Sequence, residues 1–410
     1  MLASLPPEEL CEENRLVPMR GGLGCVPGVR LAGVHAGIKP RKRDLALIAF
    51  DAPQVCAAVV TTNEIKAAPV LLSTEHLGIS GNSMRALVCN SGCANACTGE
   101  RGMRDARATA RQTAALLGIE ATQVIVASTG VIGVPLPMDR VQRGIERAVV
   151  QLENGGKASN DAAEAIMTTD RVPKLAAYAF YHDKQKYVVG GIAKGSGMIA
   201  PNMATMLAFV ATDFPMQRDD LCAMLTEATD ESFNMISVDG DMSTNDALYA
   251  FAPQGTLTPP QAFARALRSV CMDLALAMVA DGEGATKRLT LDVTHASDRA
   301  QARAIGRAVI NSNLVKTALY GEDPNWGRII AAAGSARCNL NPDTWSLKLN
   351  GKTWVEIGAI EALSEAEAHR ELEESEIHIE LDLGIGDASA TAWGCDLSRD
   401  YVRINASYRT

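Results

Sequence analysis

The stretch from Lys194 to Asp213, KGSGMIAPNMATMLAFVATD, constrains the fold more than any other part of the chain. It opens with a lysine in a glycine-rich turn and continues from Ala204 to Val210 as a short apolar strand. Thr205 is therefore expected where a tight loop meets buried structure. Packing around such a point can impose strained loop geometry and hold a hydroxyl against the preceding carbonyl.

Spacing alone leaves the role of Thr205 open. It can be an ordinary strand threonine, or an autocatalytic nucleophile that cuts the Ala204–Thr205 bond and then works as a new N-terminal residue. A third interpretation, a phosphate-binding loop, fails because Gly195-Ser196-Gly197 has neither Walker A nor G-x-G-x-x-G spacing.

Composition indicates a globular protein with a small-molecule rather than a polyanionic partner. The 410 residues are 47% hydrophobic, which is ample for a sizeable core. The net charge is −9 and the basic residues are scattered, which argues against nucleic acid. No run approaches the roughly 18 apolar residues of a membrane span, and the first ten residues are acidic where a signal peptide would be basic. We expect a cytoplasmic protein.

Cysteine and histidine offer no metal site or catalytic triad. Cys89, Cys93 and Cys97 recur every four residues without a partner histidine, unlike the usual zinc spacings, so the ten cysteines are expected to be reduced. The six histidines lie outside the motifs described below, so no Ser-His-Asp or Cys-His arrangement is visible. They are His35, His76, His182, His295, His369 and His378.

Hydrophobic periodicity predicts a chain of mixed strands and helices. Strands are expected over residues 29–37, 44–50, 55–62, 86–90, 124–127, 186–193, 288–294, 345–349, 353–358, 376–383 and 401–407. Helices are expected over 104–117, 139–152, 161–167, 218–229, 260–280, 298–311 and 313–320. Small-residue turns should follow at 91–95 and 128–133. Ser297 is a candidate N-cap, and Gly118 and Gly321 are candidate C-caps.

The stretch from Lys194 to Asp213 resembles, nearly residue for residue, the self-cleavage segment of the ornithine acetyltransferase family of arginine biosynthesis, also called bifunctional glutamate N-acetyltransferase. Four other blocks resemble family motifs in family order, and the likeness covers the chain from about residue 17 to 410. These blocks are ASTGVIG (127–133), MTTD (167–170), DGEG (281–284) and DPNWGR (323–328).

This resemblance implies an α/β fold, namely a self-cleaving αββα-type sandwich of mixed sheets flanked by helices. Such a fold is similar to that of β-aminopeptidases and is not a Rossmann fold. The chain would be cut into an α chain, residues 1–204, and a β chain, residues 205–410, and two of each would form a heterotetramer. No metal or nucleotide cofactor is implied.

In the implied reaction, Thr205 attacks the carbonyl of Ala204 and water cleaves the resulting ester. The freed α-amine, with a reference pKa of about 7.7–8.0, would then serve as general base better than a lysine side chain at about 10.4. Thr205 would next take the acetyl group of N2-acetylornithine as an ester, release ornithine and pass the acetyl group to glutamate. Such a cycle predicts ping-pong kinetics.

The resemblance also assigns the surrounding residues. Thr129 and Gly130 would form the oxyanion hole, with Lys194 facing a carboxylate and Glu283 facing an ammonium group. Arg171 stands where family members commonly have another threonine. The substrate pocket would consist of Thr168, Thr169, Lys194, Thr205, Glu283, Asn405 and Thr410, with either threonine of the first pair in contact.

Two other functions stay open on the same residues. A self-processed amidohydrolase or aminopeptidase would use water instead of glutamate as acceptor, although that branch uses serine at the cleavage point. A non-catalytic amino-acid-binding protein would keep the pocket and never cut. The sequence also leaves open whether acetyl-CoA is a second donor, and whether the pathway is primary arginine synthesis or a specialised route.

Overall fold

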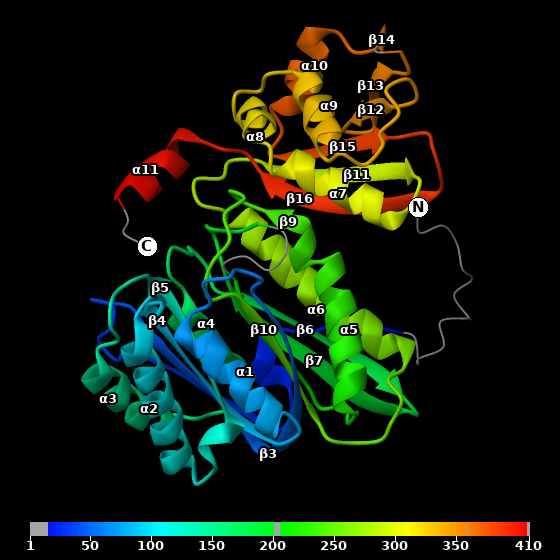
Figure 1. Ribbon diagram of the computed structural model, residues 1–410. Coiled ribbons are helices and arrows are strands. Elements are labelled where there is room, and N and C mark those ends of the chain that lie inside the picture. Colours follow the sequence, from blue (N-terminus) through cyan, green and yellow to red (C-terminus); the bar gives the residue numbers. More distant parts are fainter. Residues whose placement is uncertain (1–14, 201–205, 359, 408–410) are drawn as a thin grey trace.

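Two mixed β-sheets flanked by helices build the chain (Figure 1). The computed structural model describes residues 15–200, 206–358 and 360–407, so Ala204, Thr205 and Thr410 lie outside the described residues. The nine-stranded sheet has the order β1 (Val17–Pro18), β6 (Lys174–His182), β7 (Gln185–Lys194), β8 (Leu207–Thr212), β10 (Ala247–Pro253), β3 (Leu45–Val60), β4 (Met84–Cys93) and β5 (Val124–Val131), with β2 (Val29–Val34) paired to β3.

The second sheet has seven strands and forms the upper unit in Figure 1. Its order is β14 (Ile360–Glu361), β13 (Lys352–Glu356), β12 (Ser346–Leu349), β15 (Glu376–Asp382), β11 (Arg288–Ala296), β16 (Ala388–Cys395) and β9 (Ile236–Ser237). The helices are α1 (Ala68–Ser80), α2 (Gly99–Leu117), α3 (Met138–Val150), α4 (Gly156–Ile166), α5 (Arg218–Glu231), α6 (Gln261–Ala280), α7 (Arg299–Ile310), α8 (Asn313–Tyr320), α9 (Trp326–Ser335), α10 (Glu365–Leu372) and α11 (Arg399–Ser407).

Strand β3 joins the two halves of the large sheet. Its first half pairs with β2 and β4, and its second half pairs with β10. Side chains alternate along it, so Leu47 packs into the core under α2 and α3, while Ile48 packs into a central core that it shares with Phe209 of β8. Both faces are therefore buried, in the layered α/β sandwich that the family resemblance implies.

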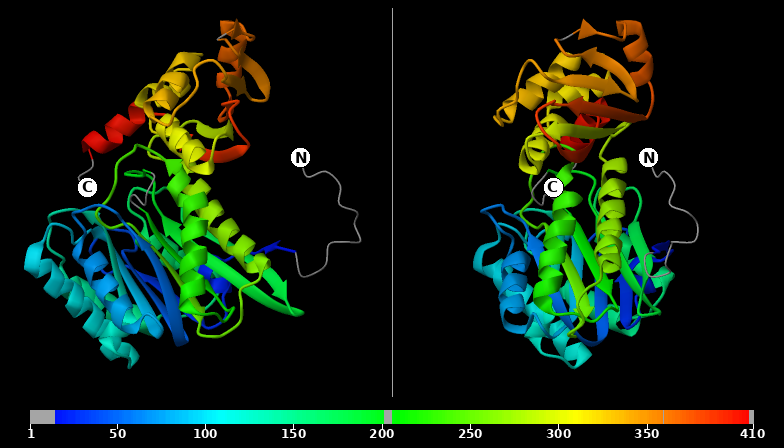
Figure 2. Two further views of the ribbon diagram at one scale, coloured as in Figure 1. Left: turned by 45° about the vertical axis from the view of Figure 1, so that its right-hand side comes forward. Right: turned by 90° about the vertical axis from the view of Figure 1, so that its right-hand side faces the viewer.

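Helices α5 and α6 cover the face of the sheet opposite to this central core, and Figure 2 shows them running alongside each other. In α6 the buried Phe263, Leu267, Val270 and Leu274 fall at helical spacing and form one apolar side. From β8, Val210 packs into the same core. Because α6 ends at Ala280, it delivers the glycine-flanked turn after it to the boundary between the two units.

The last predicted strand, Tyr401–Ser407, is wrong, because these residues belong to helix α11. The hydroxyl of Ser398 accepts hydrogen bonds from the backbone N–H groups of Asp400 and Tyr401, which satisfies donors at the start of the helix. Val402 is 62% exposed, so the alternation in this segment has no sheet face to bury. Asn405 is therefore carried by a helix.

Other predicted boundaries also shift. The strands expected at 44–50 and 55–62 are one strand, β3. Strands β4 and β5 extend into the turns expected at 91–95 and 128–133, and end at Cys93 and Val131. The N-cap of α7 is Asp298, whose carboxylate accepts the Gln301 N–H at 2.8 Å, and not Ser297. Gly118 ends α2 in the left-handed conformation, as expected.

Two expectations from composition can be compared with the described part of the chain. None of its helices is long and apolar enough to cross a membrane. The nine cysteines within it have free thiols. Burial raises the pKa of the Cys89 thiol to about 12, so this cysteine stays protonated at neutral pH.

The contact between β2 and α4 supplies a test of the fold. A Cβ atom on Gly33 would lie 1.8 Å from the carbonyl oxygen of Asp161, so Gly33→Ala must push α4 away. We expect a loss of about 3 kcal/mol in the free energy of unfolding, measured by urea titration. The control Gly78→Ala meets no atom within 4 Å, lies in α1, and should stabilise by about 0.5–1 kcal/mol. Equal stabilities of the two variants would contradict this packing.

Candidate active site

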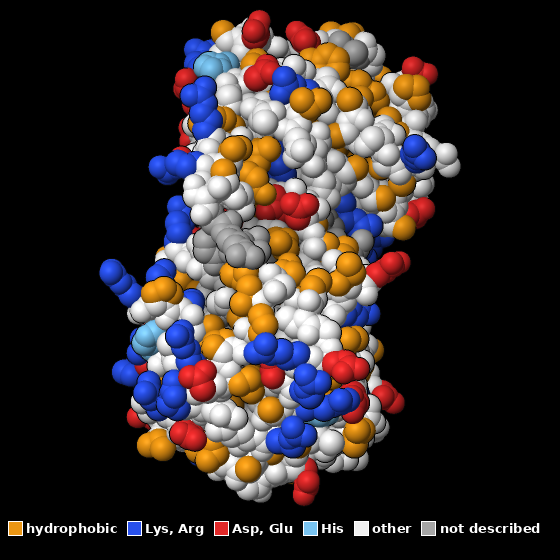
Figure 3. All heavy atoms as spheres, turned by 60° about the vertical axis from the view of Figure 1, so that its left-hand side comes forward, with side chains coloured by type: hydrophobic (Ala, Val, Ile, Leu, Met, Phe, Trp, Pro, Cys, Tyr) orange, Lys and Arg blue, Asp and Glu red, His pale blue; other side chains and the backbone are white. Residues whose placement is uncertain are grey.

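A cavity of about 240 Å³ lies where the two units meet. In Figure 3 the molecule narrows here, and acidic side chains gather at this waist. Seven residues named from the sequence line the cavity, and these are Thr129, Gly130, Thr168, Thr169, Lys194, Glu283 and Asn405. The remaining predicted site residues, Ala204, Thr205 and Thr410, lie outside the described residues.

The end of strand β5 contributes Thr129 and Gly130. Strands β4 and β5 run parallel, and their register shifts beside Gly92, opposite Gly130. Gly130 has φ 128°, and a Cβ atom there would lie 2.4 Å from the carbonyl carbon of Gly92. Only glycine fits such a close approach to β4 in this conformation.

Asn245 holds this strand end in place. Its side-chain amide donates to the carbonyl oxygens of Ala94 at 2.7 Å and Ser128 at 2.8 Å. The Ser128 hydroxyl donates in turn to the side-chain oxygen of Asn90 at 2.6 Å. A buried and satisfied polar network of this kind fixes the direction of the next residue, Thr129.

Lys194 ends β7 and is almost completely buried, with 2% of its surface exposed. The turn that follows it contacts two other cavity segments. The Ser196 hydroxyl shares a hydrogen bond of 2.8 Å with the Thr169 hydroxyl, and the Ser196 carbonyl accepts the Glu283 N–H at 2.7 Å. Among the described residues, the Thr168 hydroxyl has no hydrogen-bond partner, although its side chain also lines the cavity.

Glu283 lies directly beside this lysine turn and beside α11. Its carboxylate accepts a hydrogen bond of 2.7 Å from the side-chain amide of Asn405. A Cβ atom on Gly197 would lie 2.4 Å from the carboxylate carbon of Glu283, so the lysine turn must have glycine at this point. The cavity thus places a cation and an anion on separate loops.

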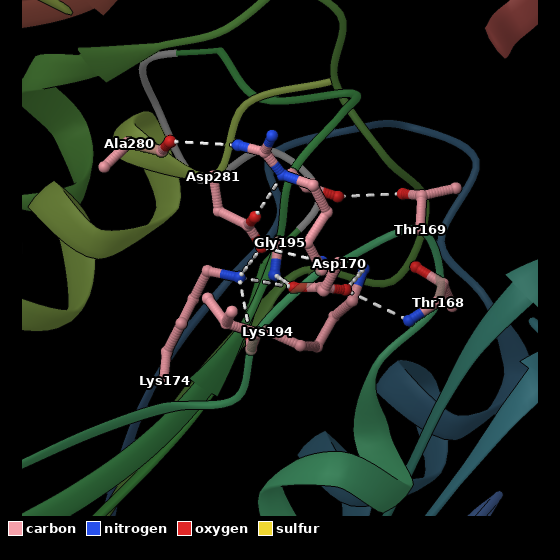
Figure 4. Close-up of polar contacts among 11 residues, drawn as sticks. Thr168, Thr169, Asp170, Lys174, Lys194, Gly195, Ala280 and Asp281 are labelled. Atoms are coloured by element: carbon pink, nitrogen blue, oxygen red, sulfur yellow. Dashed lines mark hydrogen bonds and ion pairs between the residues drawn. The ribbon is translucent and has the colours of Figure 1, made fainter. Parts of the chain in front are cut away.

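A cluster of buried charged side chains lies next to Lys194 (Figure 4). Asp170 lies 3.8 Å from the Lys194 ammonium group and 2.8 Å from that of Lys174. Its carboxylate also accepts the N–H groups of Gly195 at 2.7 Å and Thr168 at 3.0 Å. Burial alone would raise the pKa of Asp170, but the two ammonium groups outweigh burial and lower it below its ordinary range. Asp170 therefore stays ionised.

Two aspartates anchor the described chain on either side of residues 201–205. Asp239 accepts the N–H groups of Met198 at 2.6 Å and Ile199 at 2.8 Å. Asp246 accepts the N–H of Met206 at 2.8 Å. Both belong to the segment between β9 and β10, so one segment positions both approaches to the Ala204–Thr205 bond.

Tyr401 of α11 joins Asp239 at the cavity wall. Its hydroxyl donates to the Asp239 carboxylate at 3.2 Å. Burial and the neighbouring Asp239 charge raise the pKa of Tyr401, so it stays a hydrogen-bond donor at neutral pH.

The sequence prediction missed several residues of the cavity wall. Asp239, Asp241, Ser243, Asn245 and Tyr401 all line it. The polar run from residue 239 to 246, placed between two strands, is the signal that could have drawn attention to four of them.

The described residues offer one potential metal-binding group, and it lies away from this cavity. Ligand atoms of Glu322, His369 and Glu373 lie within 4.8 Å of one another on the second unit. The Lys287 ammonium group is only 3.0 Å from Glu322 and already balances its charge. The cavity itself is lined by hydroxyl, amide, carboxylate and ammonium groups, which suit a zwitterionic ligand.

Comparison with known proteins gives a consistent assignment. The chain is 48% identical over 404 residues to the arginine biosynthesis bifunctional protein ArgJ of Symbiobacterium thermophilum, covering 96% of this chain and 99% of that protein. It is 42% identical over 398 residues to the protein of the same name from Bacillus cereus, covering 95% and 97%.

Solved structures with local likeness include the ornithine acetyltransferase of Mycobacterium tuberculosis complexed with ornithine. That chain is 42% identical, with a TM-score of 0.43, and the match covers 47% of this chain and all of that one. An aminopeptidase from Ochrobactrum anthropi matches at 10% identity and a TM-score of 0.41, over 66% of this chain and 90% of that one. The model of the ArgJ family matches residues 30–410, and the chain belongs to that family.

Proposed function

We propose that this chain is an acetyltransferase of arginine biosynthesis that moves the acetyl group of N2-acetylornithine to glutamate. The observation that carries the proposal is the single cavity that collects Thr129, Lys194, Glu283 and Asn405. These residues come from both sides of the Ala204–Thr205 bond. The near full-length likeness to curated ArgJ proteins supports the same activity.

In this proposal Thr205 is the nucleophile in two successive reactions. Its Oγ first attacks the Ala204 carbonyl, the acyl group shifts from nitrogen to oxygen, and water hydrolyses the ester, which frees the α-amine of Thr205. In the working cycle, that amine takes the hydroxyl proton while Oγ attacks the acetyl carbonyl. The C–N bond breaks, ornithine leaves with the proton, and glutamate reverses the steps on the acetyl ester.

The cavity supports this chemistry by its charges and donors. Thr129 and Gly130 line the cavity, and in this proposal the threonine hydroxyl and a backbone N–H stabilise the tetrahedral oxyanion. Lys194 suits the substrate carboxylate, and Glu283 suits the δ-ammonium group of ornithine. Because the Thr169 hydroxyl already bonds to Ser196, we assign the substrate contact to Thr168.

Processing is tested by the intact mass of the purified protein beside Thr205→Ala. The wild type should give two fragments, 1–204 and 205–410, because the hydroxyl of Thr205 is required to break the preceding bond. The variant should give one chain. After incubation with N2-acetylornithine, only the second fragment of the wild type should gain one acetyl group. An uncut wild type, or a cut variant, would overturn the role of Thr205.

The oxyanion role is tested by steady-state kinetics of Thr129→Ala. Removing one donor should lower kcat about 100- to 1000-fold with little change in KM, because the donor acts in the transition state. Thr129→Ser keeps the hydroxyl and should keep most of the rate. The matched control Thr226→Ala changes an exposed threonine of α5 whose hydroxyl donates only to the Cys222 carbonyl. Near-normal turnover by Thr129→Ala would contradict the assignment.

The same assays separate transfer from hydrolysis. With N2-acetylornithine alone the wild type should release little acetate, and adding glutamate should produce N-acetylglutamate in ping-pong kinetics. Acetate release that glutamate does not affect would favour the amidohydrolase alternative. Replacing N2-acetylornithine by acetyl-CoA in this assay decides whether the enzyme also accepts acetyl-CoA as an acetyl donor.

A further inference from the structure

Lys174 is a fully buried lysine to which the proposed mechanism gives no role. Its ammonium group lies 2.8 Å from Asp170 and 2.7 Å from Asp281. The exposed fractions of the three side chains are 0%, 0% and 4%. Replacing such a buried ion cluster by apolar residues is often neutral or stabilising, so stability alone does not account for it.

Each of the two aspartates lies next to a different charged residue of the cavity. We call the segment with Lys194 the lysine wall and the turn with Glu283 the glutamate wall. Asp170 holds the Gly195 N–H and lies beside Lys194, so it belongs to the lysine wall. Asp281 comes two residues before Glu283 and is separated from it by a glycine, so it belongs to the glutamate wall. Lys174 therefore joins Asp170, which lies beside Lys194, to Asp281, which lies two residues before Glu283 (Figure 4).

Arg171 adds a second connection to the same aspartate. Its backbone N–H and its Nε both donate to the Asp281 carboxylate, each at 3.0 Å. The Arg171 side chain is 64% exposed and does not line the substrate cavity. The arginine that stands in place of the family threonine thus ties the MTTD loop to the end of α6 without lining the cavity.

The turn that carries Glu283 is anchored on both sides of this residue. After Glu283, the Ser398 hydroxyl donates to the Gly284 carbonyl at 2.6 Å, which holds the side of the turn next to α11. Gly282 and Gly284 flank Glu283, and Gly284 has φ 69°. Among the described residues, Glu283 itself makes two hydrogen bonds: its backbone N–H donates to the Ser196 carbonyl, and its carboxylate accepts from the Asn405 amide. Before Glu283, the Asp281 carboxylate accepts three charge-assisted bonds from Lys174 and Arg171, which hold the side of the turn next to α6.

We propose that Asp281 is a positioning residue, which fixes the separation between Lys194 and Glu283 through Lys174 and Arg171 and so selects the length of the amino-acid side chain. The inference rests on the proposed function, in which these two residues bind opposite ends of ornithine. A fixed distance between the two charges favours a ligand whose side chain has one particular number of methylene groups. One methylene of mismatch typically changes discrimination about 10- to 200-fold.

The test measures Kd for L-ornithine and for L-lysine, which is one methylene longer, by isothermal titration calorimetry on the processed full-length protein. The wild type should bind ornithine at least about tenfold more tightly. Asp281→Asn removes the charge but keeps the shape, and should reduce this preference about tenfold, mainly by weakening ornithine. Arg171→Met removes the outer connection only and should reduce the preference by a smaller factor.

The matched control is Asp213→Asn. Asp213 accepts the Val188 N–H at 2.7 Å near the end of β7 remote from Lys194, so this change should leave the ornithine-to-lysine ratio unchanged. Equal weakening of both ligands by Asp281→Asn would mean a merely structural role and would overturn the inference. If that variant does not fold, an unchanged ratio in Arg171→Met overturns it. A wild type that binds with this preference but transfers no acetyl group would instead refute the proposed function.

Discussion

The antiparallel pairing of β7 with β8 is the constraint on which the site depends. Their ladder brings Lys194 opposite Leu207, so the chain between them must leave the sheet and return within twelve residues. Asp239 and Asp246 hold the backbone at the two ends of this excursion. The described residues on both sides of positions 201–205 are thus fixed, and fixed ends of this kind can impose an unfavourable geometry on a peptide bond between them.

The residues that line the cavity come from segments that are distant in sequence. The sheet supplies Thr129 and Lys194 at strand ends, whereas Glu283 and Asn405 arrive on a turn and a helix that belong to the second unit. Charges that would be weak in water attract strongly at a partly dry boundary of this kind. The two-unit architecture therefore has a direct functional consequence, because neither unit alone presents both charges.

The sequence motifs predicted the residues that line the cavity better than hydrophobic periodicity predicted the strands and helices that carry them. Lys194 and Glu283 stand in short glycine-rich blocks whose composition is informative by itself. The helix that carries Asn405 was missed, since the alternation of Tyr401 to Ser407 fits a strand equally well. Its tertiary bonds, from Tyr401 to Asp239 and from Asn405 to Glu283, leave no local sequence signal. Asn245 and Asp170 act through contacts with backbone groups far away in sequence, which no local pattern reveals.

The interleaving of strands in the large sheet determines whether the two pieces of a cut chain could separate and refold. Strand β8, from the second half of the chain, lies between β7 and β10, and β10 pairs with β3 of the first half. A break at residue 204 would leave both pieces sharing one hydrogen-bonded sheet, so neither could leave without unfolding. Assembly of the cut molecule would become a second-order reaction, and recovery after denaturation would depend on concentration. Only the uncut precursor would fold as a single chain. Folding would therefore have to come before cleavage.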